Sequence, residues 1–202
     1  MSNPIQNLNS IGPMTGDSDD KNKKPADPVK ADYEEGKRFL DNGNLSQAAI
    51  SLHNALLGYE EKGDKTGIAN AANQLGHVCL AKGDFTGAEN HYKRAWDLCI
   101  EFDDPMSLMA LSSKFVEVYR GQKNYGKAVE ACFDILDTHQ NNNNPRGSVE
   151  LLETLAGIYI EAEEPAKAAD AYRTIASIHR NFKHAATADE FEQKAKELEA
   201  GA

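Results

Sequence analysis

The chain has 202 residues, of which 40% are hydrophobic and 27% charged, and its formal net charge at pH 7 is −10. Charged residues interrupt the apolar ones every few positions, so no segment stays apolar over the roughly 20 residues that a membrane-spanning helix needs. No 40-residue window is strongly basic, which argues against nucleic-acid binding, and the negative balance favours neutral or basic partners.

Residues 1–28 are rich in Asn, Ser, Pro, Gly, Asp and Lys. They lack the basic stretch and the continuous apolar stretch of a secretory signal. Because such a segment buries too little apolar surface to offset the entropy of ordering, we expect a disordered tail. The alternative is a short peptide that docks on the protein's own body.

A 40-residue repeat occupies residues 29–188. The stretch "GDFTGAENHYKRAW" from Gly83 returns as "GNLSQAAISLHNAL" from Gly43, "KNYGKAVEACFDIL" from Lys123 and "EEPAKAADAYRTIA" from Glu163. A unit that recurs at a fixed spacing of this size indicates a solenoid. The sequence therefore predicts four units, at 29–68, 69–108, 109–148 and 149–188.

Each unit contains two helical patterns. In the second unit the first helix is predicted at about Thr66–Lys82 and the second at about Phe85–Phe102, each with apolar residues at helical spacing. Because about three residues join them, the two helices must lie antiparallel. We therefore expect an all-α protein built of stacked helix hairpins.

The helix boundaries have characteristic residues. Asn44, Asp84 and Asn124 stand before second helices and are predicted to cap them, whereas Gly43 and Gly83 can adopt positive φ and end the helix before them. Prolines are predicted at the first helical position of three further helices, in Asp104-Pro105, Asn144-Pro145 and at Pro165.

Small residues recur where two helices must approach closely. Gly36, Gly76 and Ala156 share one position of the repeat, and alanines from Ala48 to Ala168 share another. The third unit has Val116 instead of a small residue, which predicts looser or rotated packing there.

The two ends of the array differ. Residues 189–202 carry a narrow apolar stripe and many charges, and are predicted to form a capping helix. No matching cap precedes the first unit, so its edge near Tyr33 and Phe39 is a candidate for self-association.

The cysteines give no sign of disulfides. Cys79, Cys99 and Cys132 are odd in number and widely spaced, which favours buried thiols and a reducing cytoplasm.

The stretch from Asn73 to Leu98, "NQLGHVCLAKGDFTGAENHYKRAWDL", resembles a tetratricopeptide repeat (TPR). The period of 40 is similar to the long-repeat subgroup of kinesin light chains, Pins-type polarity adaptors and some bacterial regulators. The resemblance covers about residues 29–188 and the terminal helix, although the tryptophan often found early in the first helix is absent. It implies a right-handed α-solenoid, a TPR-like superhelix.

The resemblance also implies a function. In that family the concave side, lined by first helices, binds an extended or helical peptide, so we expect a non-enzymatic scaffold or adaptor with protein partners. The residues opposite the core stripe of the first helices are the predicted partner-binding residues: Tyr33, Lys37, Asn70, Asn73, Gln74, His77, Ser113, Lys114, Glu117, Arg120, Glu150 and Glu153. Amide side chains among them suit the backbone of a bound peptide.

Other interpretations stay open at this point. These faces can be simply solvated, and the protein can be a self-associating assembly component or a holding chaperone for one client. The carboxylate clamp of chaperone-binding relatives is not expected, because of its five positions only Lys114 keeps the required chemistry.

Nothing in the sequence indicates an enzyme, a cofactor or a metal site. None of the six histidines pairs with another at the i, i+4 spacing that places two ligands on one helical face. A glycine-rich phosphate loop and a nucleophile elbow are also missing.

Overall fold

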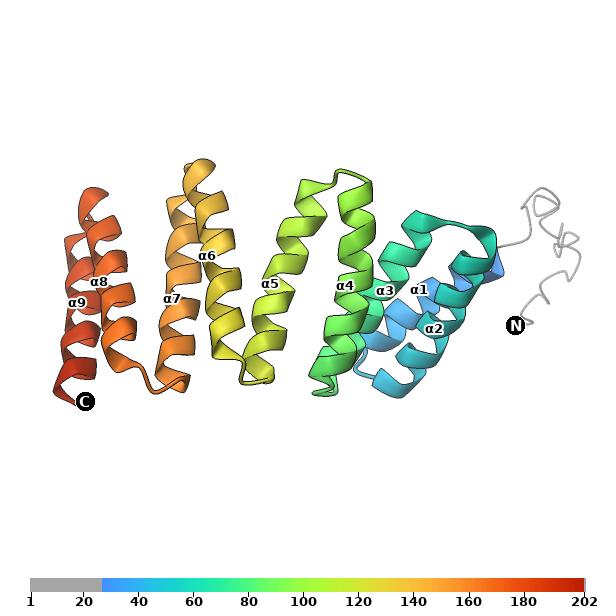
Figure 1. Cartoon of the computed structure of the whole chain (residues 1–202), viewed down its shortest axis with the longest axis horizontal. Helices are drawn as coiled ribbons and strands as arrows, with labels where there is room; N and C mark the ends of the chain where they lie inside the picture. Colours follow the sequence, from blue (N-terminus) through green and yellow to red (C-terminus); the bar gives the residue numbers. More distant parts are fainter. Residues whose placement is uncertain (1–26, 202) are drawn as a thin grey trace, which may run out of the picture.

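The computed structural model describes residues 27–201, and over this range it consists of nine α-helices without strands (Figure 1). None of these helices is long and apolar enough to span a membrane. The helices stack side by side in chain order, which confirms the predicted all-α solenoid of antiparallel hairpins. Their bounds are α1 Pro28–Asp41, α2 Leu45–Lys62, α3 Lys65–Ala81, α4 Phe85–Glu101, α5 Pro105–Gly121, α6 Tyr125–Asn141, α7 Pro145–Glu161, α8 Pro165–Asn181 and α9 Ala185–Ala200.

The two ends of the array differ slightly from the predicted boundaries. Residues 1–26 of the predicted tail lie outside the described range, and α1 begins at Pro28, with Asp27 capping it. The C-terminal helix begins at Ala185, four residues before the predicted segment 189–202. It packs along α8, as the last element of the stack (Figure 1).

The corners between helices repeat every 20 residues rather than every 40. In each corner one residue has positive φ, and two backbone bonds close the turn; Lys123 N–H donates to the Arg120 carbonyl and Asn124 N–H to the Tyr119 carbonyl, at 3.0 and 2.8 Å. This is the Schellman arrangement. Corners inside a unit and between units are therefore alike, and the positive-φ residues are Gly43, Gly63, Gly83, Asp103, Lys123, Asn143, Glu163 and Lys183.

Side-chain caps follow most of these corners. The Asp84 and Asn124 carboxyl and amide oxygens accept the backbone N–H groups of Gly87 and Lys127, at 2.9 and 3.3 Å, which confirms both predicted caps. Asn44 stands at the predicted cap position, but its exposed side chain makes no capping hydrogen bond. The predicted capped prolines are confirmed at Asp104-Pro105 and Asn144-Pro145, and Pro165 also begins its helix.

Small residues hold the helices of each hairpin close together. A Cβ atom at Gly76 would overlap the ring of Tyr92, and one at Gly36 would overlap Leu52. The alanines Ala48, Ala88, Ala128 and Ala168 have no exposed surface. These positions therefore have the steric role that the repeat predicted.

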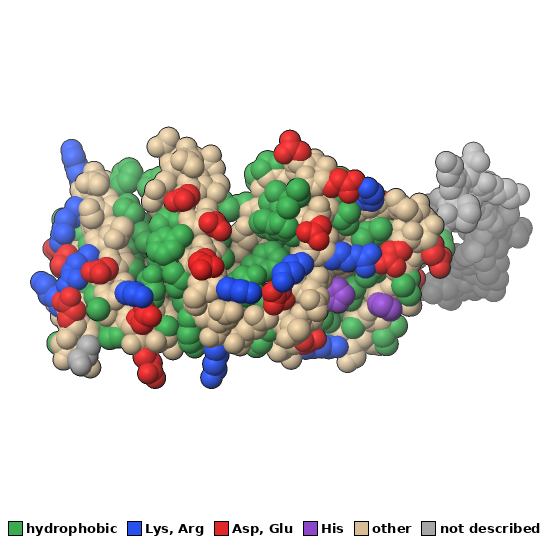
Figure 2. Space-filling view, viewed as in Figure 1, with side chains coloured by type: hydrophobic (Ala, Val, Ile, Leu, Met, Phe, Trp, Pro, Cys, Tyr) green, Lys and Arg blue, Asp and Glu red, His purple; other side chains and the backbone are tan. Residues whose placement is uncertain are grey.

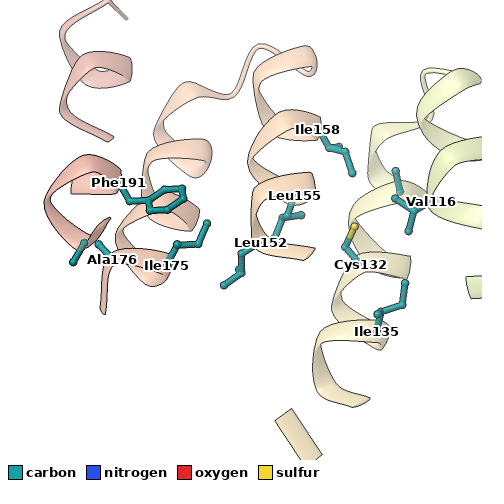
Figure 3. Packing of buried hydrophobic residues seen from close by; sticks show 11 residues of the cluster. Val116, Cys132, Ile135, Leu152, Leu155, Ile158, Ile175, Ala176 and Phe191 are labelled. Atoms are coloured by element: carbon teal, nitrogen blue, oxygen red, sulfur yellow. The ribbon is translucent and has the colours of Figure 1, made fainter. Parts of the chain in front are cut away.

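Apolar clusters join each unit to the next. The cluster of the C-terminal half, which we call the apolar seam, runs from Val116 on α5 through Cys132, Leu155 and Ile175 to Phe191 on α9 (Figure 3). Val116 itself is only 4% exposed, so the larger side chain in the third unit is accommodated within the seam. Each unit thus buries apolar surface against the next, which stabilises an array whose single units could not fold alone.

Candidate functional site

The stack presents two long faces. We call the side formed by α1, α3, α5 and α7 the first-helix face, and the side formed by α2, α4, α6 and α8 the second-helix face. All twelve predicted partner-binding residues belong to helices of the first-helix face. They fall into three places along it.

On α1, Tyr33 and Lys37 form a local pair. The Tyr33 ring packs edge-on against Tyr59 of α2, with 6.2 Å between ring centroids, and the Lys37 ammonium lies 5.4 Å from the Tyr33 centroid. Lys37 also faces Glu34 at 3.6 Å. The sequence placed Tyr33 at an uncapped edge of the first unit, open to self-association. In the structure Tyr33 is half-buried against its own hairpin.

The centre of the face is His77 on α3. Its Nδ1 atom lies 2.9 Å from the hydroxyl oxygen of Tyr92 on α4, and the two rings meet edge-on. Burial, reinforced by the Lys114 ammonium, lowers the pKa of His77, while Glu117 opposes the shift. Burial raises the pKa of Tyr92, so its hydroxyl stays protonated and can donate to a neutral His77.

The neighbours of His77 on α3 are polar and lie unengaged. Asn70 is exposed, and Asn73 and Gln74 are half-buried. None of the side-chain hydrogen bonds found within residues 27–201 involves these three amides. Their donors and acceptors are therefore open to solvent or to a partner.

Two charged contacts order the face between α5 and α7. Lys114 pairs with Glu117 on the same helix at 2.6 Å. Arg120 donates two hydrogen bonds to the Glu161 carboxylate on α7, at 2.8 and 2.5 Å. This bond raises the pKa of Arg120 and lowers that of Glu161. Arg120, predicted as a contact for a partner, thus serves to join two units.

A hollow of about 260 Å³ opens between α5 and α7. It brings together Ser113, Glu117 and Glu150, three of the predicted residues, over an apolar floor that includes Val116 and Ile135. Glu150 also accepts a hydrogen bond from Arg146 at 2.9 Å. Glu153 is exposed on α7 and does not line the hollow.

The second-helix face carries larger hollows, which sequence reasoning missed. One of about 400 Å³ lies between α4 and α6 and exposes Trp96 and Tyr119. Two more, of about 570 and 280 Å³, share lining residues and form one groove between α6 and α8. One signal was visible in the sequence. Phe133 is apolar, whereas the other three units have the polar residues His53, Lys93 and Arg173 at the same repeat position.

The structure also brings together two histidines that lie five positions apart and that the search for i, i+4 pairs did not find. His179 and His184 face each other across the α8–α9 corner, with 3.5 Å between their Nδ1 atoms. Within the described range no group of three or more His, Cys, Asp or Glu side chains is arranged to hold a metal ion. All three cysteines are free thiols, and burial raises the pKa of each.

Comparison with known proteins identifies the fold. No protein-family model and no curated protein matches the sequence. The apo form of RapI is similar in structure with a TM-score of 0.67 at 15% identity, over 86% of this chain and 63% of RapI. A putative kinesin light chain with TPR-like repeats from Podosopora anserina aligns over 88% of this chain and 98% of its own, at a TM-score of 0.49 and 14% identity. The chain thus has a TPR-type repeat fold and spans less than two thirds of the length of RapI.

Proposed function

We propose that this protein is a non-enzymatic scaffold that binds a peptide or helix of a partner protein on its first-helix face. The observation that carries the proposal is the convergence of polar side chains from separate units around the hollow between α5 and α7, where Ser113, Glu117 and Glu150 meet. The TPR-type fold supports it by analogy, since stacked hairpins leave such a face free.

The chemistry of the face indicates the kind of partner. The unengaged amides of Asn70, Asn73 and Gln74 can donate and accept, which suits a peptide backbone that has no partner strand. The carboxylates of Glu117 and Glu150 at the hollow favour a neutral or basic segment. We place the protein in the cytoplasm in this proposal, because three free thiols suit a reducing compartment.

The test fills the hollow without disturbing the core. Ser113 is exposed, so Ser113→Trp should occupy the hollow while leaving the helix intact. The matched control is Gln47→Trp, which is also at an exposed position but lies on α2. Purified proteins carrying a photo-crosslinker would be compared for the partner that they capture, with helix content measured by circular dichroism.

We expect the partner captured by the unmodified protein to be lost from Ser113→Trp and kept by Gln47→Trp. Equal capture by all three proteins would refute binding at this hollow. A covalent conversion of the captured protein or of a small molecule would refute the non-enzymatic assignment.

A further inference from the structure

The groove between α6 and α8 on the second-helix face has about the length of a short helix. Its floor is α7, from Pro145 through Leu152 to Tyr159, and its walls are α6 and α8. At 1.5 Å per residue the floor is about 21 Å long, which matches about four turns of a bound helix. Figure 2 shows apolar side chains gathered over this region of the molecule.

The groove is lined by apolar side chains that stay accessible. Phe133 on one wall is 47% exposed and Phe182 at one end is 55% exposed. Leu136 and Leu152 contribute to both hollows that make up the groove, so its apolar lining is continuous. An accessible apolar channel of this kind fits the apolar stripe of an amphipathic helix, with anchors at i, i+3 or i+4, and i+7.

The rim of the groove carries negative charge. Glu130, Asp134 and Asp137 are exposed along the crest of α6, which separates this groove from the hollow between α4 and α6 that Asp134 lines. None of the three belongs to an ion pair within the described residues. Figure 2 shows acidic side chains in a column over α6, beside the apolar patch. On the opposite wall the charges are already paired, Asp170 with Arg173 at 3.2 Å and Lys167, which also lines the groove, with Glu164.

The end of the groove near the α6–α7 corner is rich in amides. Gln140, Asn143 and Asn181 line it, beside Asn144, whose side chain already caps α7. A helix leaves four backbone N–H groups and four carbonyl groups without intrahelical partners at its ends. Amide side chains can satisfy either kind, so this end suits the terminus of a bound helix.

The geometry points to this groove as the docking site for an amphipathic helix of about four turns that carries Lys or Arg beside its apolar stripe. The charge on the α6 crest decides the occupant, since three carboxylates without ion-pair partners attract a basic helix and repel an acidic one. This surface lies on the second-helix face and is independent of the function proposed for the first-helix face.

The direct test uses two labelled model peptides of about 16 residues. One is a Leu/Lys helix with a leucine stripe, and the other is the same helix with Glu in place of Lys. Fluorescence anisotropy should show binding of the Leu/Lys peptide, weakening as salt is raised, and no comparable binding of the Leu/Glu peptide. Equal binding of both peptides would overturn the proposal.

Two pairs of variants locate the binding. Thr174 lines both hollows and is exposed, so Thr174→Trp should obstruct the groove, whereas Ser177→Trp on the same helix should not. Reversal of the crest in E130K/D134K/D137K should weaken the Leu/Lys peptide about tenfold or more. The control D41K/E61K/E190K makes the same change in net charge at exposed sites elsewhere and should leave the affinity unchanged.

Three outcomes would overturn the assignment. The first is unchanged affinity in Thr174→Trp, or in Thr174→Lys if the tryptophan variant loses helix content. The second is loss of peptide binding in Trp96→Phe with unchanged helix content, because the single tryptophan lines the hollow between α4 and α6 and not the groove. The third is a dimer in sedimentation that Thr174→Trp disrupts, which would assign the groove to a second copy of the chain.

Discussion

Replacing the glycine at a corner should destabilise the array by an amount that can be worked out. At Gly83 φ is +74°, and a Cβ atom would meet nothing within 4 Å, so Gly83→Ala introduces no clash. The left-handed conformation costs a residue other than glycine about 1–2 kcal/mol. The alanine also restricts the unfolded chain, which returns about 0.4–1 kcal/mol. We therefore expect a net loss of about 1 kcal/mol in the free energy of unfolding.

The reverse change is available in the same protein. Glu163 adopts the same conformation with φ of 60° and is exposed, so Glu163→Gly should stabilise by about the same amount. Asn143→Gly should gain much less, because asparagine tolerates positive φ better than glutamate does. The three variants thus form a graded series with a predicted sign for each.

Urea denaturation followed by circular dichroism would measure the series, and thermal midpoints should shift by about 2–4 °C per kcal/mol. Gly83 and Glu163 lie two units apart in sequence, so the double variant should recover nearly the original stability. A neutral Gly83→Ala, or a destabilising Glu163→Gly, would show that the corner conformation does not limit stability.

Three other predictions concern the helix contacts. Gly76→Ala should destabilise by about 1–3 kcal/mol in urea denaturation, because its Cβ would overlap the Tyr92 ring, and a neutral effect would contradict this. Burial lowers the pKa of His77 below its ordinary value of 6.5, so the folded state binds fewer protons than the unfolded chain at acidic pH. The contribution of His77 to stability is therefore present above pH 6.5 and is lost as the pH falls below it. His77→Gln should lose less of its free energy of unfolding on acidification than the parent protein does. Arg120→Ala should cost at most about 1 kcal/mol, less at high salt, since the side chains of Arg120 and Glu161 are 42% and 39% exposed; a loss that high salt leaves unchanged would contradict a surface ion pair.

The period of the sequence was sufficient to predict the helices. A fixed register of small residues and caps located the hairpins, and Asp84 and Asn124 cap as expected. The corners between units were harder, because from the α4–α5 corner onward the left-handed position holds charged or amide residues such as Asp103 and Asn143 rather than glycine. Backbone geometry shared by unlike residues leaves no pattern in the sequence.

The contacts between units could be predicted only in part. Residues about one period apart face each other on stacked helices. The contact between Arg120 and Glu161, which lie 41 positions apart, could therefore have been predicted from the sequence. The groove between α6 and α8 was not, because its depth depends on how far two second helices stand apart over α7. That spacing is set by packing in three dimensions rather than by any local residue type.

The likeness of all the corners restricts how the array can change its length. Duplication or deletion of 40 residues between equivalent corners would preserve both the turn geometry and the direction of every helix that follows. Loss of 20 residues would keep the turns but reverse all later helices, transferring each one to the opposite side of the molecule. The array can therefore grow or shrink in evolution only by whole hairpins, that is, by an even number of helices, because the turn geometry reverses the chain direction at every corner.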